Sequence, residues 1–146
     1  MGNNTLPIPL DIPNVKVLDV KFVGDEIHIS VESTEGSTAC RQCGRTLTTS
    51  CGYGRERVLR HLALFGRPSF IHIRPRRFEC KVCGGNPTTT QELCWAESRS
   101  PHTRAYEDYL LLMLRNSTVA DMELKEGIGY EAVMGILDRR IAKDVN

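Results

Sequence analysis

The sequence predicts an α+β fold, in which a β-rich region is followed by three helices. Two segments alternate apolar and polar residues as half-buried strands do, and the composition changes from strand-forming to helix-forming residues near Ser98. Two Cys-x-x-Cys-Gly knuckles interrupt the strand region. We therefore expect three parts: an extended, proline-containing arm at residues 1–14, β-hairpins that carry the knuckles at 15–97, and a helical bundle at 98–146.

The two knuckles have the spacing of a zinc site. Each places two thiols three positions apart, so that both sulfurs can turn toward one tetrahedral ion, and the glycine that follows permits the positive φ of a tight turn. Two knuckles on the ends of hairpins, with one ion between them, form a zinc ribbon. We expect one structural Zn²⁺, and its predicted ligands are Cys40, Cys43, Cys80 and Cys83.

Other roles for the cysteines fit the pattern less well. A redox dithiol comes singly at the start of a helix, whereas each knuckle here is followed by glycine and a polar loop. A disulfide framework is typical of small secreted chains with a leader peptide, and we expect no leader here. Cys51 and Cys94 are predicted to be buried apolar residues, although Cys51 is close enough in sequence to compete as a ligand. Trp95 is expected to cap a small core.

Two hairpins are predicted in the β-rich region. In the first, apolar residues from Ile27 to Val31 alternate strictly with polar ones after a turn at Gly24-Asp25, which predicts a strand with one buried face. We expect this hairpin to pack beside the metal site. The second is predicted at residues 57–64 and 67–78, joined around Phe65-Gly66, and it leads the chain into the second knuckle.

The charge distribution and the composition limit the classes of function that fit the sequence. The net charge is only +1, but the segment from Arg55 to Arg77 holds seven arginines and one acid, Glu56. Such a local excess is typical of a surface that binds phosphate, although a solvated strand face has the same pattern. Aromatic residues make up 6% of the chain, so the core is modest and a metal would help to stabilise it. No apolar run is long enough to cross a bilayer.

Three helices are predicted in the last third of the chain. The first begins at Ser100-Pro101, with serine as its N-cap, and extends to about Arg115. The second spans Val119–Glu126 and the third runs from Tyr130 to about Ala142, with a tight turn at Gly127-Ile128-Gly129 between them. This order is typical of a helix-turn-helix, and a plain three-helix bundle is the alternative. The residues predicted to face inward are Ala105, Tyr109, Leu112 and Met113, then Ala120 and Leu124, then Val133, Ile136, Leu137, Arg140 and Ile141.

A succession of motifs between the knuckles points to a known family. The motifs are Cys40-x-x-Cys43-Gly44, Arg57-x-x-Arg60-His61-Leu62, Gly66-Arg67-Pro68, Arg76-Arg77-Phe78-x-Cys80-x-x-Cys83 and Thr90-Gln91-Glu92. Together they resemble the N-terminal zinc finger of ISL3-family insertion-sequence transposases, in which a helix-turn-helix also follows. The resemblance implies that the two modules bind the terminal inverted repeats of a transposon. In the family a DDE nuclease domain comes afterwards, and this chain stops at Asn146, so we expect no catalytic residues and no strand-transfer activity from it.

The predicted DNA contacts come from both modules. On the ribbon hairpin, Arg55, Arg57, Arg60, Arg74, Arg76 and Arg77 are expected to bind phosphates. In the third helix, Tyr130 and Glu131 are expected nearest the bases, and Arg139 and Lys143 are expected to bind phosphates. The alternatives are a zinc-ribbon module that docks onto another protein or regulates it, and a thiol-based redox protein.

The expected partners and location follow from this interpretation. Double-stranded DNA at transposon ends is the main partner, a full-length transposase or a second copy of the chain is a further one, and no membrane partner is expected. Six cysteines without a leader indicate a reducing compartment, so we expect the chain at the nucleoid in the bacterial cytoplasm.

Overall fold

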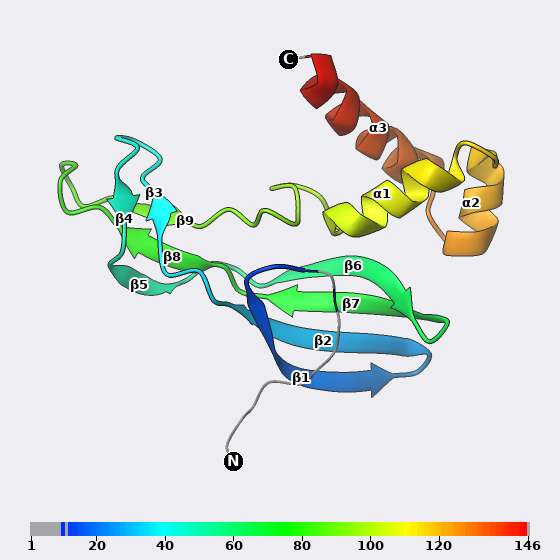
Figure 1. Ribbon diagram of the computed structural model, residues 1–146, viewed down its shortest axis with the longest axis horizontal. Helices are drawn as coiled ribbons and strands as arrows, with labels where there is room; N and C mark the ends of the chain where they lie inside the picture. The colour runs from blue at the N-terminus through cyan, green and yellow to red at the C-terminus, as the bar shows by residue number, and fades with distance from the viewer. Residues whose placement is uncertain (1–9, 11, 146) are drawn as a thin grey trace.

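The computed structural model describes Leu10 and residues 12–145, with side chains as far as Ile141. In this part of the chain nine strands form three sheets and precede three helices, which confirms the predicted α+β class. Figure 1 shows the two smaller sheets at the left, the larger sheet at the lower right, and the helices above it.

The larger sheet has four strands in the order β1-β2-β7-β6. Their bounds are β1 (Val15–Val23), β2 (Glu26–Ser33), β6 (Arg57–Leu64) and β7 (Arg67–Ile73). Both predicted hairpins are present, because β1 pairs with β2 and β6 pairs with β7, each antiparallel. The hairpins meet through β2 and β7, which run parallel. Parallel neighbours need a long crossover connection, and the chain between β2 and β7, which contains the first knuckle, supplies it.

One face of this sheet is buried, as its alternating pattern predicts. Ile27, Ile29 and Val31 are 3%, 0% and 4% exposed, and Ile71 of β7 is 0% exposed beside them. Residues Leu93–Ala96 cover this face and bring Trp95 into the core, as expected. The rest of this core comprises Leu10, Val17, Leu59 and Ile73.

The first hairpin does not pack beside the cysteines, so that prediction is wrong. Its apolar residues belong to the core of the larger sheet, whereas Cys40 and Cys80 belong to a separate cluster with Leu47 and Phe78. The physical reason lies in the partner of β2. Strand β7 also has isoleucines on its buried face. When β2 pairs with β7, the apolar residues of the two strands form one continuous surface.

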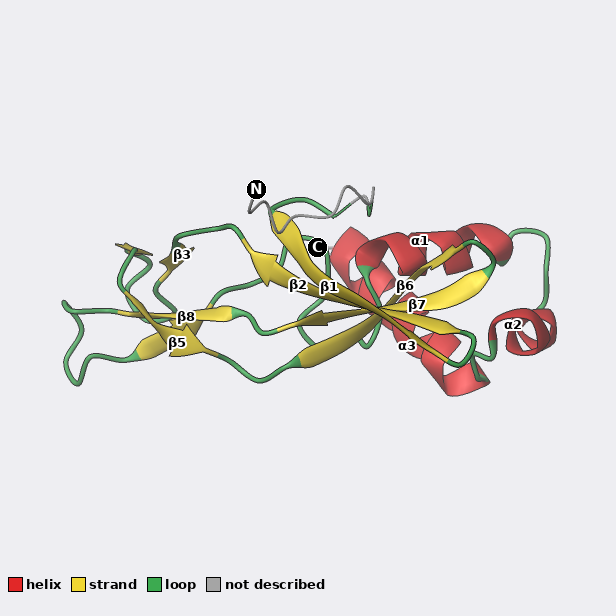
Figure 2. Ribbon diagram, turned by 90° about the horizontal axis from the view of Figure 1, so that it is seen from below, coloured by secondary structure: helices red, strands yellow, loops and turns green. Residues whose placement is uncertain are grey.

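The two smaller sheets carry the cysteines. A two-stranded sheet pairs β3 (Thr38–Ala39) with β4 (Thr46–Leu47), and a three-stranded sheet has the order β5 (Ser50–Tyr53), β8 (Arg76–Glu79), β9 (Thr88–Thr90). The segment predicted as one strand at 67–78 is thus two strands, because Pro75 has no N–H to continue a ladder. Figure 2 shows β5 and β8 at the end of the molecule away from the helices.

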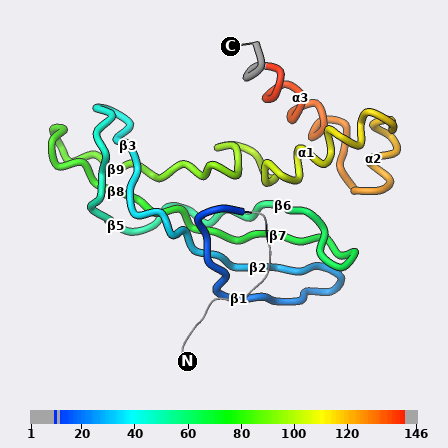
Figure 3. The backbone as a smooth tube through the Cα atoms, in the orientation of Figure 1, coloured from blue at the N-terminus to red at the C-terminus, as the bar shows by residue number. Residues whose placement is uncertain are grey.

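The helices are α1 (Arg104–Met113), α2 (Val119–Glu126) and α3 (Tyr130–Val145), and no described helix is long and apolar enough to cross a membrane. The bounds of α2 and the start of α3 agree with the prediction. The N-cap of α1 is Thr103 and not Ser100. The residues before α1 extend the edge of β6, because Arg60 N donates to Pro101 O and Thr103 N donates to Arg60 O, each at 2.9 Å. Figure 3 shows the chain returning from β9 along the sheet to this point.

The predicted inward faces of α1 and α2 are wrong. In α1 the buried residues are Tyr106, Glu107 and Leu110, whereas Leu112 is 59% exposed. In α2 Met122 is buried, and the predicted Ala120 and Leu124 are exposed. In α3 the inward residues Val133 and Ile136 are confirmed, Leu137 is partly buried, and Ile141 is 57% exposed.

Candidate metal centre and nucleic-acid interface

The structure brings the four predicted ligands together. Cys40 and Cys43 follow β3, Cys80 and Cys83 follow β8, and all four sulfurs lie within 4.8 Å of one another. The Sγ atoms of Cys40 and Cys83 are 4.0 Å apart, and those of Cys43 and Cys80 are 3.8 Å apart. Four sulfurs around a tetrahedral zinc, with bonds of about 2.3 Å, are separated by about 3.8 Å. The cluster therefore fits one structural zinc ion.

Backbone amides prepare the knuckles for a cation. Cys40 Sγ accepts from Gln42 N, and Cys80 Sγ accepts from Cys83 N, each at 3.4 Å. Hydrogen bonds from the amides of Cys43 and Gln42 lower the pKa of Cys40 to about 6, and amides of Cys83 and Val82 lower the pKa of Cys80. The pKa of Cys83 is raised to about 12, first by its hydrogen bond with Cys43. Thiolates this close repel, so a zinc ion would supply the charge that lets all four ionise.

The backbone around each knuckle fixes the sulfurs. Cys40 N donates to Arg45 O at 2.8 Å, and Cys80 N donates to Pro87 O at 3.0 Å. In the first knuckle Gly44 has a φ of 77°, as predicted, whereas in the second the positive φ of 82° falls on Gly85 and not on Gly84. Phe78, which is fully buried, packs against the thiols from β8.

Cys51 and Cys94 are both exposed, so the prediction that they are buried is wrong. Cys51 lies on β5, all four residues of which are exposed. Neither thiol belongs to the four-cysteine group, so Cys51 does not compete as a ligand.

Two predicted DNA contacts, Arg57 and Arg60, hold partners inside the protein. Arg57 Nη2 donates to Glu97 O at 2.7 Å and to Ser100 O at 3.0 Å, and burial lowers the pKa of its guanidinium. Arg60 Nη1 donates to Glu126 O at 2.6 Å, and its guanidinium lies 4.9 Å from the centre of the Tyr106 ring. Arg57 therefore fastens the sheet to the segment before α1, and Arg60 fastens it to α1 and α2.

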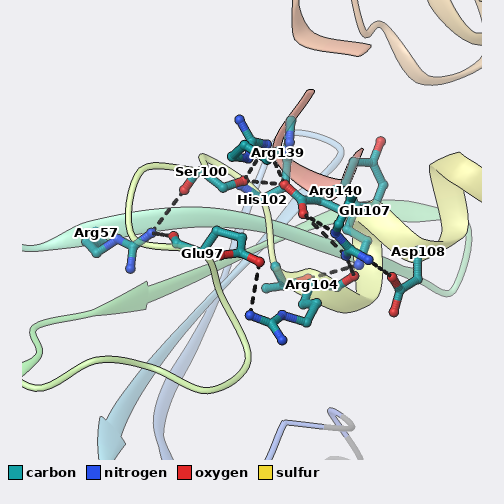
Figure 4. A network of polar contacts seen from close by, with 11 residues as sticks. Arg57, Glu97, Ser100, His102, Arg104, Glu107, Asp108, Arg139 and Arg140 are labelled. Carbon is teal, nitrogen blue, oxygen red and sulfur yellow. Dashed lines mark hydrogen bonds and ion pairs between the residues drawn. The ribbon is translucent and has the colours of Figure 1, made fainter. Parts of the chain in front are cut away.

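Arg139 belongs to a network around Glu107, which Figure 4 shows. The carboxylate of Glu107 is 0% exposed, and it accepts from Arg139 Nη2 and from Ser100 Oγ at 2.6 Å each. Arg140 approaches the same carboxylate at 3.3 Å and pairs with Asp108 at 2.7 Å. The network joins α1, α3 and the segment before α1.

The other predicted contacts lie at the surface. Arg55 and Arg74 are exposed, and so are Tyr130 and Glu131 at the start of α3. The side chain of Lys143 lies outside the described residues.

The remaining two predicted arginines, Arg76 and Arg77, differ in exposure. Arg76 is half-buried, donates from Nη1 to Glu35 O at 3.2 Å and has its guanidinium 5.4 Å from the centre of the Phe78 ring. Arg77 is exposed and donates to Thr88 Oγ1 at 2.6 Å.

A groove on the ribbon, lined by two arginines and two glutamates, was missed by the sequence reasoning. Arg41 N donates to Thr89 Oγ1 and Arg41 Nε donates to Thr88 O, each at 3.1 Å, which brings Arg41 to the same threonines as Arg77. The groove encloses about 660 Å³, and two acids, Glu35 and Glu92, also line it. Its other lining residues are Ser37, Thr38, Ala39 and Thr90. The run Thr88–Thr90 directly after the second knuckle was the available signal.

The comparisons with known proteins concern one segment, which holds the four cysteines and also β6 and β7 of the larger sheet. No curated protein and no solved structure matches the chain. Residues 36–83, which begin before β3 and end at the last of the four cysteines, match the family model described as the zinc-finger of transposase IS204/IS1001/IS1096/IS1165. The chain therefore carries a zinc-ribbon module of the ISL3 transposase type.

Proposed function

We propose that this chain is a DNA-binding part of a transposase and that it recognises the terminal inverted repeats of its element. One observation carries the proposal: the segment that matches a transposase zinc finger also presents two exposed arginines, Arg41 and Arg77, beside threonine hydroxyls. Arginine, threonine and backbone N–H groups are the donors that proteins commonly use to hold DNA phosphates.

The contacts divide between the modules. Arg41 and Arg77 bind phosphates from the ribbon groove, and Arg55 and Arg74 extend the basic surface toward the larger sheet. Tyr130 and Glu131 are exposed at the N-terminus of α3 and contact base edges, as the first residues of a recognition helix do. Arg57 and Arg60 already have internal partners and contribute by fixing the larger sheet to the residues that follow β9, whereas Arg139 joins α3 to α1.

Fluorescence anisotropy with the zinc-loaded protein tests this proposal. The probes are a duplex taken from the terminal repeat of an ISL3-type element and a scrambled duplex of the same composition. Arg41→Ala and Arg77→Ala should each weaken binding to both duplexes and reduce the slope of log K against log salt by about 0.9. Tyr130→Ala should instead reduce the preference for the repeat.

Arg67→Ala is the matched control, because Arg67 is exposed and is the first residue of β7, which begins at the end of the sheet farthest from the ribbon (Figure 1). Its salt slope should equal that of the unchanged protein. Unaltered binding by both ribbon variants would overturn the assignment of the groove. No binding of either duplex at low salt would overturn the proposal and favour the protein-docking alternative.

A further inference from the structure

The outer face of the larger sheet holds a second group of metal-ligating side chains. His28 of β2 and His72 of β7 project from the face opposite the buried isoleucines, because side chains alternate along each strand. Each imidazole is about a quarter exposed, with side-chain values of 23% for both. His28 stacks on Phe70 with 5.1 Å between the ring centres, which holds its plane in place.

Four side chains form a line across this face. The two imidazoles meet with His28 Nδ1 2.7 Å from His72 Nε2. Behind His28, its Nε2 lies 2.9 Å from Glu26 Oε1, and behind His72, its Nδ1 lies 3.8 Å from Glu56 Oε1. Each imidazole therefore has one nitrogen toward a carboxylate and one toward the other imidazole.

The protons on this line determine what the pair can bind. A carboxylate accepts hydrogen bonds, so it favours the tautomer in which the imidazole nitrogen facing it carries the N–H. A neutral imidazole has only one N–H. If both rings are neutral and each directs its single N–H toward its carboxylate, the two inner nitrogens face each other with bare lone pairs. Without a cation, one inner nitrogen instead carries the N–H and donates to the other at 2.7 Å, and that imidazole turns a bare nitrogen toward its carboxylate. A metal ion between two bare inner nitrogens would let both rings keep the N–H that faces a carboxylate.

We propose that His28 and His72 form a binding site for a divalent transition metal, distinct from the four-thiol site. Imidazole nitrogen suits Zn²⁺, Cu²⁺ and Ni²⁺, and a carboxylate behind a ligating histidine is the arrangement that orients such ligands in metalloproteins. Tetrahedral bonds of about 2.0 Å to nitrogen separate two ligands by about 3.3 Å, so the rings need to part by only about 0.6 Å.

The surroundings leave room for the remaining ligands. A hollow of about 320 Å³ is lined by His72 and also by Ser30, Glu32, Glu56 and Arg74, so water can reach the side chain of His72. The charge of Arg74 opposes a metal ion there. Lys21 is the register partner of His28 on β1 and is the cation on this face nearest to it in the ladder. Its charge opposes metal binding, so this site is weaker than the ribbon site, with two protein ligands against four.

Calorimetric titration of the zinc-loaded chain with ZnCl₂ and with NiCl₂ tests the proposal. The unchanged protein should bind one further equivalent of either metal, and His28→Gln and His72→Gln should each lose it while keeping the ribbon zinc. Glu26→Gln should weaken the second event by about 10-fold or more, because the orienting carboxylate is lost. Asp25→Asn removes a neighbouring charge from the turn and should leave it unchanged.

Two results would overturn the metal site. One is the absence of any second binding event, which would mean that the imidazoles contact only each other and the carboxylates. The other is a second event that persists in both histidine variants, which would place the metal elsewhere, such as at an exposed thiol. If a histidine variant fails to fold, histidine NMR of the unchanged protein decides: Ni²⁺ should broaden the resonances of His28 and His72 before those of His61 and His102, and equal broadening refutes the site.

Discussion

The buried carboxylate of Glu107 allows a direct test of what Arg139 does. Arg139 was predicted to bind a DNA phosphate, whereas its guanidinium contacts the Glu107 carboxylate at 2.6 Å. A hydrogen bond to a charged group contributes about 1.5–3 kcal/mol, and Arg139 is 31% exposed, so solvent reduces the value toward the lower end. We expect Arg139→Ala to lower the free energy of unfolding by about 2 kcal/mol.

The change Glu107→Gln should cost more, because it removes the charge that two arginines share. Arg139 and Arg140 would both lose their ionised partner, and Ser100 Oγ would face an amide, so we expect a loss of about 3 kcal/mol. In a double-mutant cycle the coupling between Glu107 and Arg139 should be about 2 kcal/mol.

Urea unfolding of the zinc-loaded protein, followed by far-UV circular dichroism, measures these free energies. The control is Arg115→Ala, an exposed arginine just after α1, which should change stability by less than about 0.5 kcal/mol. The reasoning is refuted if Arg139→Ala is as stable as the control and instead reduces the salt slope of DNA binding by about one, because Arg139 would then act on phosphate.

Three further predictions concern the ribbon and α1. Cys80→Ser should reduce bound zinc from one equivalent to none, measured by mass spectrometry of the metal, and a retained equivalent would contradict the four-thiol site. Burial lowers the pKa of His102, so the unfolded chain takes up a proton first as the pH falls. The stability that His102 contributes is therefore present above the ordinary histidine pKa of 6.5 and is lost as the pH falls below it. The unfolding free energy should fall toward pH 5, and His102→Gln should flatten this dependence. Thr103→Ala removes the N-cap of α1 and a 2.8 Å contact with His61, and it should cost about 1–2 kcal/mol in urea unfolding, whereas an unchanged midpoint would show that the cap is dispensable.

Local features of the fold were predictable from the sequence. The knuckles bring two thiols together within four residues, so Cys40 with Cys43 and Cys80 with Cys83 follow from spacing alone. The helix α2 is bounded by Thr118, whose side chain forms a capping box with Asp121, and by Gly127 in the left-handed region. Signals of this kind act over a few residues, so they do not depend on how the rest of the chain folds.

The faces of α1 could not be predicted, and the reason is its composition. Residues 109–114 include tyrosine, leucine and methionine at nearly every position, so apolar spacing allows several inward faces. The structure selects Tyr106 and Leu110, because Arg60 of β6 packs over the Tyr106 ring and Tyr106 Oη donates to Glu126 Oε1 at 2.7 Å. The periodicity of apolar residues in the sequence carries no information about these tertiary contacts.

The roles of the arginines show a similar limit. The sequence correctly indicates a cationic segment, but it does not say which guanidinium groups find a carbonyl or a carboxylate inside the fold. Arg57 and Arg60 lie within the same run as Arg77, and only the pairing of β6 with residues 101–103 directs the first two inward. The exposed Arg41 lies outside that run and between two predicted zinc ligands, so the sequence gives no sign that it has a role apart from the knuckle.

The topology also bears on what zinc does for the whole chain. The ribbon is built from two separate segments: β3, β4 and β5 lie between β2 and β6, and β8 and β9 follow β7. The chain therefore leaves the larger sheet for the ribbon after β2 and again after β7. Among the residues that the structure describes, the core of the sheet contains no cysteine, and the cysteine cluster contains no isoleucine. Because each part has its own apolar cluster, loss of zinc should disorder β3, β4 and the knuckles while β2 and β7 stay paired. The metal should therefore act on the arrangement of Arg41 and Arg77, and hence on the proposed DNA binding, more than on the stability of the sheet that carries His28 and His72.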